Sequence, residues 1–279
     1  MSRQMALATT SVASQSTASA RVEHTRAASF VRDLLTVARR SLRAASREPA
    51  AVIPSLIIPL FFFAVNVGSL GGVAKAMSGL DYTAFQLPVA VIFAVTGVSR
   101  ANALVADISS GYFERLLLTP INRLALLLGM MAADFGLVVL LCLPVLVMGM
   151  IVGVSFATGI AGMVAFVLLS AIWGVAFTGF PYAIALRTGN PGAVAASFIL
   201  FFPFAFLTTA YVPREALSGW LATVAAFNPV TYILEGLRSL VMTGWDTGPL
   251  LGGAVATVIV GTISIGLAMA ALRRRVRVP

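Results

Sequence analysis

Residues 124–152 read LALLLGMMAADFGLVVLLCLPVLVMGMIV, a long apolar run that contains a single charged residue, Asp134. A helix of about 20 apolar residues is long enough to cross the hydrocarbon core of a bilayer. Comparable runs recur along the chain and predict an all-α polytopic membrane protein. Its six transmembrane helices are expected at 50–70, 85–106, 124–152, 159–186, 192–211 and 249–272.

The composition supports this class. Of the 279 residues, 59% are hydrophobic and 10% charged, and the mean hydropathy is +0.97. Soluble domains carry about 25% charged residues, so the composition excludes an ordinary soluble enzyme, a coiled coil and a disordered chain. One cysteine and one histidine leave no basis for a disulfide framework or a His/Cys metal site, and we expect no bound cofactor.

The net charge of +9 comes mainly from arginines in the N-terminal fifth and in the last seven residues. Lys and Arg are enriched on the cytoplasmic side of membrane proteins. The distribution therefore predicts a multi-pass protein of the plasma membrane with both termini in the cytoplasm. It does not predict a nucleic-acid-binding face.

The residues before the first span divide into two parts. Residues 1–29 are rich in Ser, Thr and Ala and predict a disordered cytoplasmic tail. Residues 30–48 place apolar and Arg side chains on opposite faces of a helix, a pattern typical of an amphipathic interfacial helix in contact with lipid headgroups. The transmembrane domain is then expected over 49–279.

Residues 107–123, DISSGYFERLLLTPINR, interrupt the apolar pattern on the expected cytoplasmic side. Gly111 is a candidate hinge or helix start, followed by the acid–base pair Glu114 and Arg115. A short amphipathic helix between two long spans can transmit force from a soluble partner. The alternative is an ordinary loop with topological charges.

Residues 212–248 form the second interruption, on the expected external side. Asn228 followed by Pro229 predicts a helix N-cap with proline at the first helical position. Glu235 and Arg238 then lie three apart on one helix face, where they can pair. We expect external re-entrant helices here, before the last span.

Charged residues inside membrane spans are costly and often functional. Arg100 and Asp107 lie seven apart, two turns along one face of the second span. Asp134 either faces a watery cavity, pairs with Arg100, or lies near the cytoplasmic surface.

The two interruptions resemble those of type-2 ABC exporter permeases, the class that includes daunorubicin/doxorubicin-resistance permeases. In that family a cytoplasmic loop reads roughly Gly-x-x-Glu-Arg-Leu and then Pro-x-x-Arg, and an Asn-Pro begins a later helix that carries an Arg and ends at Gly. The matching residues here are Gly111, Glu114, Arg115, Leu116, Pro120 and Arg123 in the loop, and Asn228, Pro229, Arg238 and Gly244 in the later helix.

The resemblance implies a bacterial exporter of hydrophobic or amphipathic cargo such as a drug, lipid or natural product. It implies a dimer with a second permease copy or a paralogue, and a separate ABC ATP-binding subunit that uses ATP and Mg. The chain has no Gly-x-x-x-x-Gly-Lys-Ser/Thr phosphate loop, so the permease itself is not expected to be an enzyme. By carry-over, the loop residues form the coupling helix that docks on the ATPase.

Three other functions compete with this one. An intramembrane enzyme lacks support because no His-Glu-x-x-His or Gly-x-Ser-x-Gly motif occurs. A proton-coupled secondary carrier that uses Asp134 as its relay is the main alternative. A structural or regulatory subunit without transport of its own is the third.

Overall fold

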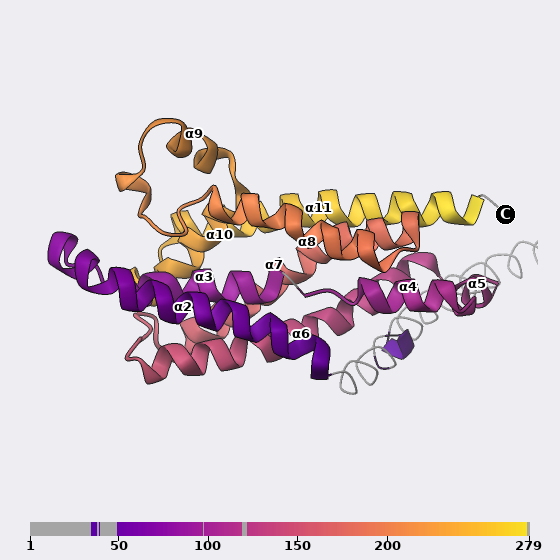
Figure 1. Ribbon diagram of the computed structural model, residues 1–279, viewed down its shortest axis with the longest axis horizontal. Coiled ribbons are helices and arrows are strands. Elements are labelled where there is room, and N and C mark those ends of the chain that lie inside the picture. The colour runs from indigo at the N-terminus through magenta and orange to yellow at the C-terminus, as the bar shows by residue number, and fades with distance from the viewer. Residues whose placement is uncertain (1–34, 38, 40–48, 97, 119–121, 278–279) are drawn as a thin grey trace, which may run out of the picture.

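The computed structural model describes residues 35–37, 39, 49–96, 98–118 and 122–277, and the regular structure in these ranges is helical throughout (Figure 1). The predicted tail 1–29 lies outside the described residues, as does the predicted interfacial helix 30–48 apart from 35–37 and 39. The α-helices are α2 (Pro49–Ser78), α3 (Tyr82–Thr96), α4 (Ala101–Ser109), α5 (Tyr112–Leu117), α6 (Arg123–Ile151), α7 (Gly159–Thr188), α8 (Pro191–Phe206), α9 (Gly219–Phe227), α10 (Pro229–Arg238) and α11 (Thr247–Arg277). A 3-10 turn, η1 (Arg214–Ala216), precedes α9, and a π-helical turn, η2 (Ser239–Thr243), follows α10.

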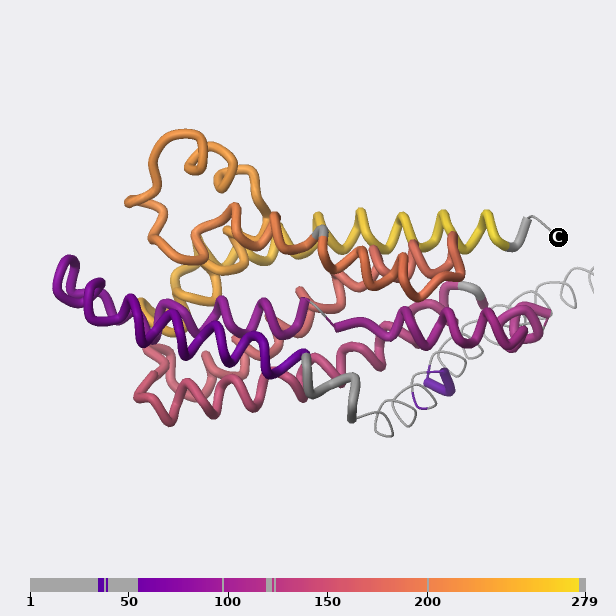
Figure 2. Tube along the Cα trace, viewed as in Figure 1, coloured from indigo at the N-terminus to yellow at the C-terminus, as the bar shows by residue number. Residues whose placement is uncertain are grey.

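Five helical segments in the described part of the chain are long and apolar enough to cross a membrane. They run along the long axis of the bundle, with α5 and the C-terminus at one end and α9 at the other (Figures 1 and 2). We call these the α5 end and the α9 end. Multi-pass character is thereby confirmed. The five segments are Ser55–Ser78, Tyr82–Ser109, Leu124–Ile151, Gly159–Thr188 and Thr247–Arg275.

The fifth predicted helix, 192–211, is shorter than expected. Helix α8 has 16 residues and ends at Phe206, which gives a length of about 24 Å against a hydrocarbon core of about 30 Å. Beyond it the Thr208 hydroxyl donates to the Ala205 carbonyl and accepts from the Ala210 amide, so a side chain replaces helical bonds. The chain then continues without helix to Val212, and six full-length transmembrane helices are not confirmed.

The second span, predicted as one helix over 85–106, consists of two helices. Helix α3 ends at Thr96 and α4 begins at Ala101. Side chains satisfy the amides at the start of α4: the Ser99 hydroxyl accepts from the Ala101 amide, and Asp134 Oδ1 on α6 accepts from the Arg100 amide. Side-chain hydrogen bonds therefore stabilise the break between α3 and α4.

Helices α7 and α11 pack more extensively than any other pair, because their contact is built from small residues. A Cβ added to Gly179 would lie 2.5 Å from the Ser264 carbonyl carbon, and one added to Gly261 would lie 3.3 Å from the Ala176 side chain. The Ser264 hydroxyl also donates to the Ala176 carbonyl. Small residues that allow close backbone approach are the usual basis of helix association in membranes.

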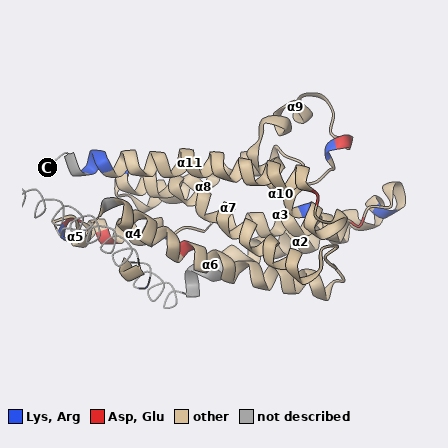
Figure 3. Ribbon diagram, turned by 180° about the vertical axis from the view of Figure 1, so that it is seen from behind, with Lys and Arg blue, Asp and Glu red and all other residues tan. Residues whose placement is uncertain are grey.

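Charged residues lie mainly toward the two ends of the bundle (Figure 3). The exception on α6 is Asp134, which is the only acid of that helix and is fully buried. This separation of charged ends from an apolar middle is expected of a bundle that spans a bilayer.

Candidate functional site

The loop predicted to transmit force forms a helical corner at the α5 end. Gly111 has a positive φ of 69° and caps the N-terminus of α5, which confirms it as a helix start. A residue with a Cβ adopts this left-handed conformation only with strain. Glycine therefore allows the chain to turn from α4 directly into α5.

The corner has a buried and an exposed side. Phe113 is buried in an apolar cluster with α4, α6 and α7 residues, whereas Leu118 is 88% exposed. Arg115 is exposed and Leu116 half-buried on the same helix. Pro120 lies outside the described residues, and Arg123 begins α6, whose N-terminus the Asn122 side chain caps.

Glu114 pairs across the fold, and not with its neighbour Arg115. Its Oε1 lies 3.1 Å from Nη2 of Arg275 near the end of α11. The other terminal nitrogen of Arg275 donates to the Leu186 carbonyl at 3.0 Å, near the end of α7. No local sequence pattern predicts this contact, since Arg275 belongs to a run of arginines that is explained as a topological charge.

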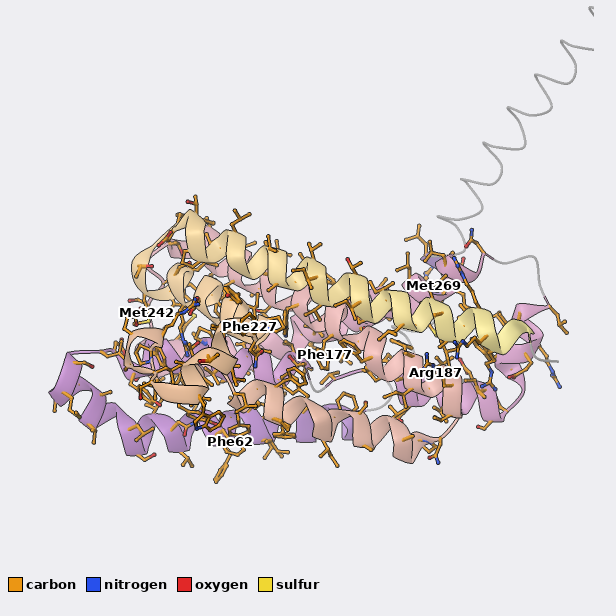
Figure 4. The ribbon with its side chains drawn as sticks, turned by 90° about the horizontal axis from the view of Figure 1, so that it is seen from above. Phe62, Phe177, Arg187, Phe227, Met242 and Met269 are labelled. Carbon is orange, nitrogen blue, oxygen red and sulfur yellow. The ribbon has the colours of Figure 1, made fainter. Side chains whose placement is uncertain are left out.

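An apolar pocket of about 230 Å³ opens between α2, α3 and α8. Phe93 of α3 contacts two other aromatic rings of the lining. The centroid of its ring lies 6.1 Å from that of Phe201 and 6.4 Å from that of Phe202. Phe177 of α7 lies midway along the bundle, with Met242 toward the α9 end and Arg187 and Met269 toward the α5 end (Figure 4). The lining residues are Ser55, Ile58, Pro59, Phe62, Phe93, Ala94, Phe198, Phe201 and Phe202.

At the α9 end, the predicted cap at Asn228 is confirmed. Its Oδ1 accepts from the Val230 amide at 3.0 Å, and Pro229 is the first helical residue. The Asn228 amide nitrogen also donates to the carbonyls of Phe204 and Leu207. The cap therefore joins the start of α10 to the end of α8.

The predicted pairing of Glu235 with Arg238 is wrong. Glu235 pairs with Arg214 at 3.3 Å. Partial burial raises the pKa of the Glu235 carboxyl, and the nearby Arg214 and Arg238 oppose this shift. Spacing along one helix could not reveal Arg214, which approaches from the η1 turn.

Arg238 is buried and bonds to two other elements. Its guanidinium donates to the Phe85 carbonyl at 3.1 Å, to the Thr209 hydroxyl at 3.1 Å and to the Ala210 carbonyl at 3.2 Å. It also lies 3.5 Å from the centroid of the Phe85 ring. Gln86 donates to the same Ala210 carbonyl, so α3, α10 and the segment after α8 are joined at one place.

Asp134 is fully buried within the bundle. Its Oδ1 accepts from the backbone amide of Arg100, and no ion pair between the two side chains is found among the described residues. In the same part of the structure, Asp134 Oδ2, Arg100 Nη1 and the Tyr182 hydroxyl are buried without a hydrogen-bond partner. Asp107, seven residues after Arg100, lies within α4 toward the α5 end.

Comparison with known proteins agrees with this architecture. The sequence pattern described as ABC-2 type transporter matches residues 32–242. The daunorubicin resistance ABC transporter permease protein DrrB1 of Streptomyces coeruleorubidus is 27% identical over 231 residues, which cover 80% of this chain and 81% of that protein. The probable doxorubicin resistance ABC transporter permease protein DrrC of Mycobacterium tuberculosis is 28% identical over 232 residues, 82% of this chain and 83% of that protein.

A third relative comes from a different lineage. The putative transport permease ycf38 of Cyanophora paradoxa is 25% identical over 220 residues, 76% of this chain and 74% of that protein. The matched pattern covers well over half of the chain and extends from before α2 to η2. The chain therefore belongs to the ABC-2 type transporter family, as a permease, the membrane subunit of an ABC transporter.

Proposed function

We propose that this permease belongs to an ATP-driven exporter of apolar or amphipathic molecules, in which a separate ATP-binding subunit hydrolyses ATP with Mg. The permease is proposed to act as a dimer, with a second copy or a paralogue. Family membership supports the general scheme. The names of the two bacterial relatives, which refer to daunorubicin and doxorubicin resistance, support the direction and the class of cargo.

The charges support an orientation with the α5 end in the cytoplasm. That end carries Arg115, Arg187 and the arginines of 273–275, whereas the opposite end carries Lys75 and Arg214 outside the buried core. Since Lys and Arg are enriched on the cytoplasmic side, α5 then faces the compartment that contains ATP. The short helices α9 and α10 then lie on the external side, as proposed for re-entrant helices.

The observation that carries the cargo assignment is the aromatic pocket between α2, α3 and α8. Small-molecule sites are mainly apolar and aromatic concavities, and this one offers phenylalanine rings with Ser55 as its one polar side chain. Ile58, Phe62 and Phe202 line it and are each at least 40% exposed, so the pocket is open to the side of the bundle. An apolar molecule in the bilayer can therefore reach it without passing through water.

The α5 corner is the proposed docking site for the ATP-binding subunit. Leu118 is the most exposed large apolar side chain in the described structure. Leu118 lies close in sequence to the charged residues Glu114 and Arg115, at the end of the bundle that we propose to face the cytoplasm, so a soluble partner can reach it.

Co-purification tests the docking site. The tagged permease is extracted from its native membrane in mild detergent, and bound proteins are identified by mass spectrometry. We expect an ABC ATP-binding protein with the wild type and its loss with Leu118→Asp. Met77→Asp is the matched control, because Met77 is 84% exposed at the opposite end of the bundle. Absence of any ATP-binding protein from the wild-type preparation would refute the exporter assignment.

Ligand-stimulated ATP hydrolysis tests the pocket, with daunorubicin as the probe. Removing a phenylalanine ring that contacts the ligand costs about 1.5–3 kcal/mol of binding free energy. The daunorubicin concentration that gives half-maximal stimulation should then rise roughly 10- to 100-fold. Phe202→Ala should show this shift. Phe61→Ala should not, because Phe61 is 62% exposed on α2 and does not line the pocket. Equal responses of both variants would place the cargo elsewhere.

A further inference from the structure

Arg275 contacts two different elements at the α5 end. One terminal nitrogen donates to Glu114 on α5 at 3.1 Å, and the other donates to the Leu186 carbonyl on α7 at 3.0 Å. Arg275 itself belongs to the last turns of α11. A single side chain therefore connects the short helix α5 to the ends of two long spans that already pack closely against each other.

The two contacts together suit an arginine side chain. The last four carbonyls of a helix lack intrahelical partners, and Leu186 lies two residues before the end of α7. The planar guanidinium can donate to this carbonyl and to a carboxylate at the same time, whereas a lysine ammonium is a compact point charge. A cation at a helix C-terminus is also favoured by the helix dipole.

Helix α5 depends on such external contacts for its position. It has six residues, and isolated helices shorter than about 12 residues are marginal in water. Phe113 provides its buried apolar contact on one side. The Glu114–Arg275 pair fixes α5 to α11.

We propose that Arg275 is a positioning residue that makes α5, α7 and α11 move together, so that a displacement of α5 by the ATP-binding subunit reaches the last span. This inference rests on the proposed function. It also changes the role expected for Glu114, whose carboxylate acts within the chain and is not itself a contact of the ATPase.

The energetics allow this role to be separated from folding. The Glu114 and Arg275 side chains are 48% and 27% exposed. Because partly exposed ion pairs contribute little to stability, variants of the pair should fold and still bind the ATP-binding subunit through the apolar side of the corner. Transmission of the movement should nevertheless depend on the pair.

Hydrogen–deuterium exchange of the complete complex in lipid nanodiscs tests the proposal. Nucleotide-free and vanadate-trapped complexes are compared in two regions, residues 112–118 of the corner and residues 267–275 of α11. In the wild type, trapping should change exchange in both regions. In Arg275→Glu, the change at 112–118 should persist and the change at 267–275 should be lost.

Two further variants make the result specific. Arg274→Glu is the matched control, because Arg274 is an exposed neighbour with no hydrogen bond to α5 among the described residues, and it should behave like the wild type. Glu114→Gln should lose the response at 267–275, as Arg275→Glu does. It replaces Arg275→Glu as the test variant if that protein does not reach the membrane.

The outcomes are distinguishable. Equal responses of Arg275→Glu and Arg274→Glu would overturn the role of Arg275 while the exporter assignment stands. A wild-type response confined to 112–118 would do the same. A wild-type preparation without any ATP-binding subunit would overturn the proposed function, and this inference with it.

Discussion

Arg238 joins several elements at the α9 end, and replacing it tests how much these contacts stabilise the fold. The change is Arg238→Met, which keeps a long apolar side chain but removes the charge and the donors. It abolishes three hydrogen bonds and the contact with the Phe85 ring. Because these contacts join α10 to α3 and to the segment after α8, their loss should separate elements that are distant in the sequence.

The magnitude follows from these contacts. A hydrogen bond in a protein contributes a net of about 1 kcal/mol, and a desolvated cation–π contact contributes about 2 kcal/mol. The variant no longer buries a charge, which offsets part of the loss. We therefore expect Arg238→Met to lower the free energy of unfolding by about 2–4 kcal/mol, or about 5–10 °C in the melting temperature.

The single cysteine supplies the assay. Cys142 is fully buried in α6, so a fluorogenic maleimide reacts with it only when the bundle opens. The melting temperature is read from dye fluorescence during heating in detergent. Arg214→Met is the control, because Arg214 is 47% exposed and its ion pair should contribute less than about 1 kcal/mol.

Two results would refute this reasoning. The first is a melting temperature of Arg238→Met within about 2 °C of the Arg214→Met control. The second is full recovery in Arg238→Lys, because an ammonium cannot reach acceptors on α3 and on residues 209–210 at the same time.

Three further predictions concern other parts of the fold. Gly179→Ala should destabilise the bundle by about 1–3 kcal/mol, since its Cβ would lie 2.5 Å from the α11 backbone; Gly71→Ala, with nothing within 4 Å, should not lower the melting temperature. Asp134→Asn should be more stable than Asp134→Leu by about 1–2 kcal/mol, because only Asn retains an acceptor for the Arg100 amide; ATP-driven transport that persists in Asp134→Asn would also refute a proton relay there. Burial raises the pKa of Glu235, so its ionised form destabilises the folded state at neutral pH, and this effect disappears as pH falls through the raised pKa. Glu235→Gln should therefore melt slightly above the wild type at pH 7.5, by less than about 1 kcal/mol, and the difference should shrink on acidification; a difference that grows would contradict the sign.

Local sequence signals predicted the local structure well. Long apolar runs indicate transmembrane helices because the bilayer requires a minimum length, and five of these runs form helical segments long enough to cross it. Gly111 and the Asn228–Pro229 pair predict helix starts from backbone chemistry that involves only neighbouring residues. Both are confirmed by the structure.

Partners that are distant in the sequence could not be predicted in this way. Glu235 pairs with a residue 21 positions away, and Glu114 with one 161 positions away. Helix periodicity is informative only over three or four residues, so it assigned Glu235 to Arg238. The end of α8 at Phe206 and the break before α4 likewise depend on bonds from Thr208 and Asp134, which apolar composition does not encode.

The break in the second span determines how movement can pass through the permease. At the α9 end, α3 is held by Arg238 and Gln86, whereas α4 and α5 lie beyond the break and are held to α11 by Arg275. A helix transmits displacement along its axis only while its hydrogen bonds are continuous, and here they stop between Thr96 and Ala101. Helices α6, α7 and α11 are each continuous between the two ends, and the small residues between α7 and α11 leave no space for one of these two helices to slide past the other without cost. A displacement of α5 can therefore reach the α9 end through α6, which follows it in sequence, or through α11, which the Glu114–Arg275 pair joins to it, but not through an unbroken second span.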